Sequence, residues 1–240
     1  MNGKSVGLLK ALTREQLLGN YSKLSVYVSL YILIYFTLSE LLLMVSVSGL
    51  LVSVLVSLVQ ALLISIFDVG LIRICMRLTR GQEINIKEFF YVLKHDPDKV
   101  IIVCFVMWLF MTLIQLPLLI PESFAEGAGP GKGAVVLIKC VLVSAFLIIY
   151  IFADILLSQC YYLYLDHPEY TATQILKLST YVMKDHKIKY FYLMINVFGM
   201  GCLTVLTFGI GIFWMLPNMY ILKINFYEDI KGEFDAVSLR

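Results

Sequence analysis

The sequence contains few charged residues for its length. Asp, Glu, Lys and Arg make up 15% of the 240 residues, whereas hydrophobic residues make up 60%. A soluble globular domain carries about 25% charged residues, so this composition excludes an ordinary soluble domain and predicts an integral membrane protein. Since a transmembrane helix needs about 20 residues, residues 1–240 have room for roughly six spans as a single transmembrane domain.

Residues that bind metals or carry redox chemistry are also scarce. There are three histidines and five cysteines, and no cysteine pair has CxxC spacing, so a disulfide framework, a zinc site and a redox motif are unsupported. Each histidine neighbours an aspartate, which leaves a three-histidine metal site geometrically conceivable. Turn chemistry explains these pairs more simply, and we expect neither a metal nor a cofactor. The pairs are His95-Asp96, Asp166-His167 and Asp185-His186.

Catalytic motifs are absent from the sequence. It has no Ser/His/Asp set, no paired carboxylates and no HExxH, and the glycine-rich stretch 123–134 lacks the Gly-Lys-Ser/Thr that ends a phosphate-binding loop. We therefore expect no catalytic residue, no enzymatic activity and no nucleic-acid partner.

Apolar runs predict six transmembrane helices, arranged as three hairpins in an all-α fold. The run from Leu24 to Phe67 is too long for one crossing, so we expect a tight turn at 46–49. The first span is too long for the h-region of a signal peptide and contains Glu40, so we expect it to be retained. The predicted spans cover 24–44, 50–72, 100–119, 135–163, 190–206 and 208–224.

Three polar segments with helical periodicity predict amphipathic helices on the cytosolic membrane surface, over 5–18, 85–95 and 171–184. In the last of these, Thr171 and Gln174 form a capping-box start. Its apolar face contains residues spaced three and four apart, and the helix should end near Asp185-His186. The segment 85–95 has a similar start at Asn85 and Glu88.

Positive charge is unevenly distributed along the chain. All but two of the 19 lysines and arginines lie in the leading segment, in 73–99, in 177–189 and in the tail. By the positive-inside rule both termini are expected in the cytosol. A lysine at the membrane edge precedes each predicted hairpin, which leads to the hypothesis of a pseudo-threefold repeat. The alternative is that any three helical hairpins look alike at this level. These lysines are Lys23, Lys99 and Lys189.

Several short motifs resemble a bacterial membrane-protein family, domain of unknown function 975. They are Thr13-Arg14-Glu15-Gln16-Leu17, Gly70 to Gly81, Tyr164 to Pro168, Lys177 to Lys187, and Thr207 to Gly211 with Trp214 and Pro217. The chain departs from the family at His167, where asparagine is usual, and at Asp185, where glycine is usual. The resemblance implies six spans in a bacterial cytoplasmic membrane and implies no established activity.

Ionisable groups within apolar runs are the candidate site residues. Each costs about 2.5–3.5 kcal/mol at the centre of a span. Asp68, Arg73, Arg77 and Asp154 fall near the cytosolic ends of their spans and could form a ligand site for an anion or a lipid headgroup. The alternative is interhelical ion pairs that only fix packing. Glu40 is expected at the outer interface.

The sequence leaves the function open between two main classes. We expect a non-enzymatic accessory or structural membrane protein, involved in envelope homeostasis, in assembly or as a partner of a transport system. The alternative is a transporter, channel or lipid-handling protein with a cytosol-facing polar cavity near Asp68, Arg73 and Asp154. The expected partners are the lipid bilayer, anionic lipid headgroups, and another membrane protein or a second copy of the chain.

Overall fold

The computed structural model describes residues 4–45, 49–95, 97–115 and 132–238. All regular structure in these ranges is helical, in agreement with the predicted all-α class. The elements are α1 (Val6–Leu17), α2 (Tyr21–Val45), α3 (Leu50–Thr79), the short 3-10 helices η2 (Ile86–Phe90) and η3 (Val92–Lys94), α4 (Pro97–Gln115), α6 (Lys132–Leu157), α7 (Cys160–Asp166), α8 (Ala172–Leu206) and α9 (Ile212–Ser238).

Side-chain caps define where α1 and α8 begin. The Ser5 hydroxyl accepts a hydrogen bond from the backbone N–H of Leu8 at 3.3 Å. At α8 the predicted capping box is present, because the Thr171 hydroxyl accepts from the Gln174 N–H and the Gln174 side chain accepts from the Thr171 N–H. Both caps satisfy N–H groups that the first helical turn leaves without a backbone partner.

α8 is one unbroken helix of 35 residues, so the predicted helix end at Asp185-His186 is wrong. No glycine or proline lies between Ala172 and Val197, and Asp and His each lower helix propensity by less than about 1 kcal/mol. Burial of Met183 and Tyr190 on either side of this point outweighs that small local preference.

Other boundaries also differ from the expected ones. α3 continues to Thr79, which places Arg73 and Arg77 on the helix, and α9 continues to Ser238 where a polar tail was expected. The segment 85–95 forms two short 3-10 helices in place of one amphipathic α-helix. The turn expected at 46–48 and the glycine-rich stretch up to residue 131 lie outside the described residues.

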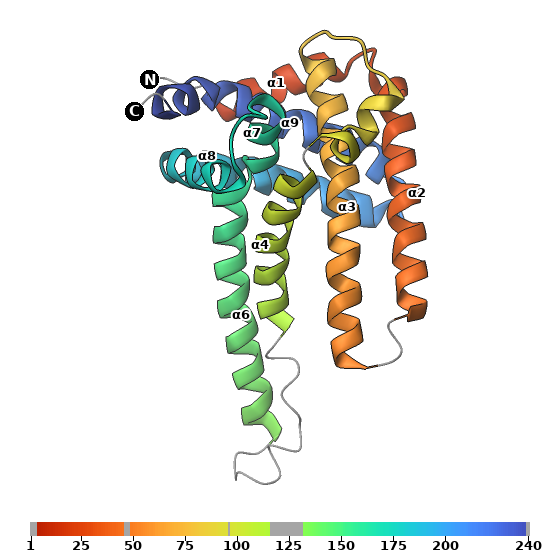
Figure 1. Ribbon diagram of the computed structural model, residues 1–240, viewed down its shortest axis with the longest axis vertical. Coiled ribbons are helices and arrows are strands. Elements are labelled where there is room, and N and C mark those ends of the chain that lie inside the picture. The colour runs from red at the N-terminus through yellow and green to blue at the C-terminus, as the bar shows by residue number, and fades with distance from the viewer. Residues whose placement is uncertain (1–3, 46–48, 96, 116–131, 239–240) are drawn as a thin grey trace.

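The long helices run in two directions. In Figure 1, α2, α3, α4 and α6 run down the picture, each packed against the next in the chain, whereas α8 and α9 run across it. α8 packs on α4 and α6, and α9 packs on α1, α2 and α3. Because the third hairpin runs across the other two, this arrangement does not confirm the predicted pseudo-threefold repeat of equivalent hairpins.

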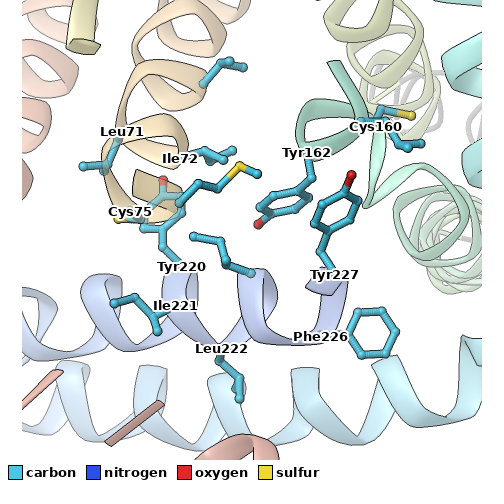
Figure 2. Packing of buried hydrophobic residues seen from close by; sticks show 14 of the residues in the cluster. Leu71, Ile72, Cys75, Cys160, Tyr162, Tyr220, Ile221, Leu222, Phe226 and Tyr227 are labelled. Atoms are coloured by element: carbon cyan, nitrogen blue, oxygen red, sulfur yellow. The ribbon is translucent and has the colours of Figure 1, made fainter. Parts of the chain in front are cut away.

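The core is centred on α9. Figure 2 shows Tyr220, Phe226 and Tyr227 of α9 close to the helices that pack on it. The ring of Tyr227 stacks on that of Tyr162 from α7, with centroids 5.5 Å apart, and Phe226 lies 5.3 Å from Tyr190 of α8. α9 therefore joins elements that are distant in sequence.

Four helical stretches among the described residues are long and apolar enough to cross a membrane. Many large hydrophobic side chains on them are exposed, including Phe198 at 73% and Val205 at 78%. Apolar exposure of this extent is typical of a surface that another apolar phase or a partner covers. The four stretches are Tyr21–Leu41, Leu51–Thr79, Val136–Asp166 and Ala172–Leu206.

Candidate functional site: two carboxylates and a lysine between two cavities

Asp68 lies on α3. Its carboxylate accepts a hydrogen bond from the Tyr220 hydroxyl of α9, and it lines a cavity of about 410 Å³. Ser57, Gln60 and Ser65, also on α3, line the same cavity. Aromatic side chains from α2, α4 and α7 complete the cavity wall: Tyr31, Trp108 and Tyr161.

Asp154 lies on α6 and lines a different cavity, of about 760 Å³, between α6, α8 and α9. The rest of this lining is mainly apolar, with Phe191, Phe198 and Met215 among its residues. Asp154 and the partly buried Tyr150 are the polar members of this wall. The second cavity thus has one carboxylate in otherwise hydrophobic surroundings.

Lys223 of α9 is the third charged residue of this region. Its ammonium group is within electrostatic reach of both Asp68 and Asp154, and it also faces the hydroxyl of Tyr190 from α8. All three charged side chains are partly buried. We call Asp68, Lys223 and Asp154 the triad.

The triad does not balance its own charge. With all three groups ionised, two carboxylates and one ammonium leave one negative charge. Among the described residues, Lys223 is the cation whose charge acts on Asp68 and also on Asp154. An uncompensated charge away from water is costly, so such a site favours binding one proton or one small cation.

Arg73 and Arg77 do not join the triad. Arg73 Nε lies 2.6 Å from Glu88 Oε2, and Arg77 Nη1 lies 2.7 Å from Glu88 Oε1. The Arg73 guanidinium also lies 3.5 Å above the Tyr91 ring. Arg73 and Arg77 therefore both bind Glu88, whereas Asp68 and Asp154 line separate cavities and share the electrostatic influence of Lys223. Whether any of the four binds a ligand stays a prediction.

The helical geometry explains this separation. Five residues at about 100° each place Asp68 and Arg73 about 140° apart around α3, whereas Arg73 and Arg77 lie only about 40° apart. Similar depth along a span, which the sequence indicated, does not imply a shared face. The segment 85–95 folds onto the arginine face and supplies Glu88.

A second charged cluster joins the ends of α3, α7 and α9. Arg80 donates two hydrogen bonds to the carboxylate of Asp166, at 2.7 and 2.8 Å, and binds Glu228 as well. Lys231 lies 2.7 Å from Asp166, and the Tyr227 hydroxyl donates to it at 3.1 Å. The hydrogen bonds to Asp166 raise the pKa of Arg80, while burial and Asp166 raise the pKa of Tyr227, so both remain donors. We interpret this cluster as a structural tie.

Sequence reasoning missed Lys223, which was counted only as one of the basic residues of the tail. A usable signal was present, because Tyr220 and Lys223 are three residues apart in an apolar stretch and so share a helix face. What the sequence could not supply was the packing of α9 on α3 and α8.

The histidines lie beside different aromatic neighbours. His95 stacks on Tyr91 and His167 on Tyr170, whereas His186 lies near Phe226. Within the ranges that the structure describes, no group of three or more His, Cys, Asp or Glu is arranged to hold a metal ion.

Comparisons with known proteins identify the family of this chain. No curated protein and no solved structure matches it. One family model matches residues 4–233, nearly the whole chain and every element from α1 to most of α9. The chain therefore belongs to the family described as protein of unknown function (DUF975).

Proposed function

We propose that this is a multi-pass integral protein of the bacterial cytoplasmic membrane, and that it moves a proton or another small cation through the triad. The observation that carries the proposal is that Lys223 is within electrostatic reach of two carboxylates that line separate cavities. This is the transport alternative raised by the sequence, with Lys223 in the place expected for Arg73.

Composition and exposure support the membrane placement. Four described stretches have the length and apolar character of spans, and those on α2, α3 and α6 run along one axis with α4 beside them (Figure 1). The start of α1, the end of α9 and α7 lie at the same end of the molecule (Figure 1), where the positive-inside rule would place the cytosol. The pseudo-threefold repeat remains a hypothesis, tested by superposing residues 5–68, 84–160 and 171–228.

The charge balance indicates how the triad would work. Lys223 can neutralise only one carboxylate at a time. The other carboxylate would then take a proton or cation from its own cavity, because an isolated charge in apolar surroundings is unfavourable. When Lys223 turns from Asp154 to Asp68, a proton held by Asp68 would pass to Asp154 and leave into the cavity at Asp154. Lys223 would then return to the empty Asp154 carboxylate, and Asp68 would take the next proton from its own cavity. Each such cycle would carry one proton from the cavity at Asp68 to the cavity at Asp154 and leave Lys223 where it began.

Ion flux in proteoliposomes tests the proposal. We expect the wild-type protein to collapse an imposed pH or monovalent-cation gradient, read by a dye enclosed in the vesicles. Asp154→Asn and Lys223→Met should reduce the flux at least tenfold. Asp98→Asn, an exposed carboxylate in the first turn of α4, is the matched control and should behave as wild type. Wild-type flux no faster than in empty vesicles would contradict the proposal.

An accessory role is the second candidate, favoured by the connection between α8 and α9. Around this connection apolar side chains are highly exposed, including Leu206 at 74% and Phe208 at 98%. Such a surface would suit a helix of another membrane protein. Under this function the triad variants would lower stability, and purification from membranes after chemical cross-linking would recover one partner bound at this connection.

A further inference from the structure

A second kind of pocket lies between α1 and α8, away from the triad. It has a volume of about 730 Å³ and is lined by Val6 and Lys10 of α1 and by an α8 stripe from Tyr192 to Leu203. We call it the α1–α8 groove. Its α8 residues recur every three or four positions, so the groove follows one face of the helix.

The groove has a polar side and an apolar side. Lys10 and Asn196 supply an ammonium group and an amide, and among the described residues neither has a hydrogen-bond or ion-pair partner. No acidic residue lines the groove in this part of the chain. The remaining walls include Ile195 and Leu203, which are 50% and 61% exposed.

The dimensions of the groove suit a lipid chain. Tyr192 to Leu203 covers about 16 Å along α8 at 1.5 Å per residue, so the apolar wall can contact one extended acyl chain over that distance. Lys10 lies on α1, which packs on α9 near the charged end of that helix, where the Lys4 N–H binds Asp229. Leu203 lies toward the apolar connection between α8 and α9.

We propose that the α1–α8 groove binds one anionic glycerophospholipid. Its phosphate would accept hydrogen bonds from Lys10 and Asn196, and one acyl chain would lie along α8 toward Leu203. A basic residue near a membrane surface contributes about 1 kcal/mol to binding an anionic lipid, equivalent to about a fivefold preference. A zwitterionic lipid would lose this preference because its headgroup carries a cation that Lys10 repels.

Glycine at position 199 keeps the groove open. A Cβ built on Gly199 meets no atom within 4 Å, so a larger side chain fits there without displacing the protein and would occupy the space of the acyl chain. Gly232 of α9 is also helical with open space at its Cβ, which makes it a matched control. Lys184, an exposed lysine of α8, is the control for Lys10.

Native mass spectrometry tests the site. The full-length protein is reconstituted with equal amounts of phosphatidylglycerol and phosphatidylcholine, extracted in mild detergent and weighed with its retained lipids. We expect one retained phospholipid, with phosphatidylglycerol favoured about fivefold. Lys10→Gln should remove the preference and Gly199→Leu should reduce retention of either lipid, whereas Lys184→Gln and Gly232→Leu should match wild type.

Three results would overturn the proposal: no retained phospholipid on the wild type, equal retention of the two lipids, or an unchanged preference in Lys10→Gln. A dimer without lipid would assign the groove to a second copy of the chain and overturn it equally. The inference rests on the membrane placement proposed above but not on transport, because Lys10 and Gly199 lie outside the triad. Absent flux with intact lipid selectivity would therefore reject only the transport proposal.

Discussion

The hydroxyl of Tyr220 donates a hydrogen bond to the carboxylate of Asp68, although 152 residues separate the two in the sequence. This contact ties α9 to α3, and Lys223 of α9 is within electrostatic reach of both Asp68 and Asp154. The same contact therefore has two consequences, since it fixes the packing of α9 and it positions one carboxylate of the triad.

Replacing Tyr220 with phenylalanine should separate these consequences. The ring still fills its place in the core, but Asp68 loses a donor. A hydrogen bond to a charged group contributes about 1.5–3 kcal/mol, so we expect the free energy of unfolding in a fixed detergent to fall by about 2 kcal/mol. Tyr181→Phe is the control, because Tyr181 is 56% exposed. An equal effect of both changes would contradict a specific role for the Tyr220 hydroxyl.

Lys223→Met should destabilise the protein more than a surface lysine change does, because it leaves two carboxylates without their cation. Breaking a fully buried pair costs about 3–5 kcal/mol. Since the triad is partly buried, we expect about 2–3 kcal/mol.

Removing one carboxylate as well should restore part of this loss. The double variant Lys223→Met with Asp154→Asn should be more stable than Lys223→Met alone, by about 1 kcal/mol, as expected for interacting residues. Lys177→Met on the exposed face of α8 is the control for losing a lysine. Strictly additive effects in this double-mutant cycle would show that Lys223 and Asp154 do not interact.

Local features of the fold could be read from the sequence, whereas relationships between helices could not. The capping box at Thr171 depends on residues three apart and was predicted. The continuation of α8 through Asp185 depends on burial of Met183 and Tyr190 against other elements, which no local pattern contains.

The candidate site shows the same limit. The sequence singled out Asp68 and Asp154 because carboxylates in apolar runs are costly, and both are within electrostatic reach of Lys223 in the structure. It grouped Arg73 with them by depth along the spans. The actual neighbours of Arg73 depend on the orientation of α3 and on the position of Glu88, and both follow from tertiary packing.

Arg80→Lys should weaken the tie between α3, α7 and α9 although it keeps the charge. Arginine binds Asp166 through two parallel hydrogen bonds and reaches Glu228 as well, a geometry that the lysine ammonium cannot reproduce. Because Arg80 is 31% exposed, we expect a loss of only about 1 kcal/mol in the free energy of unfolding.

Salt provides the check on this cluster. Lys231 lies 2.7 Å from Asp166, and Lys231→Met removes that charge. Partly exposed ion pairs are screened at high ionic strength, so the difference between wild type and Lys231→Met should shrink when denaturation is repeated in 1 M salt, whereas the difference for the charge-conserving Arg80→Lys should change less. A difference that grows with salt would show that packing, and not charge, dominates at this position.

Gly70→Ala should detach the segment 85–95 from α3. A Cβ at Gly70 would overlap the carbonyl group of Phe89, and a backbone carbonyl cannot turn aside as a flexible side chain does. Overpacking of this kind costs about 1–3 kcal/mol. The displacement would also move Glu88 away from Arg73 and Arg77, so the expected loss is at the upper end of this range.

Gly199→Ala, with open space at its Cβ, should instead be neutral or stabilising by up to about 1 kcal/mol. Hydrogen exchange of residues 85–95 should rise in Gly70→Ala alone, and unchanged protection there would contradict the close contact.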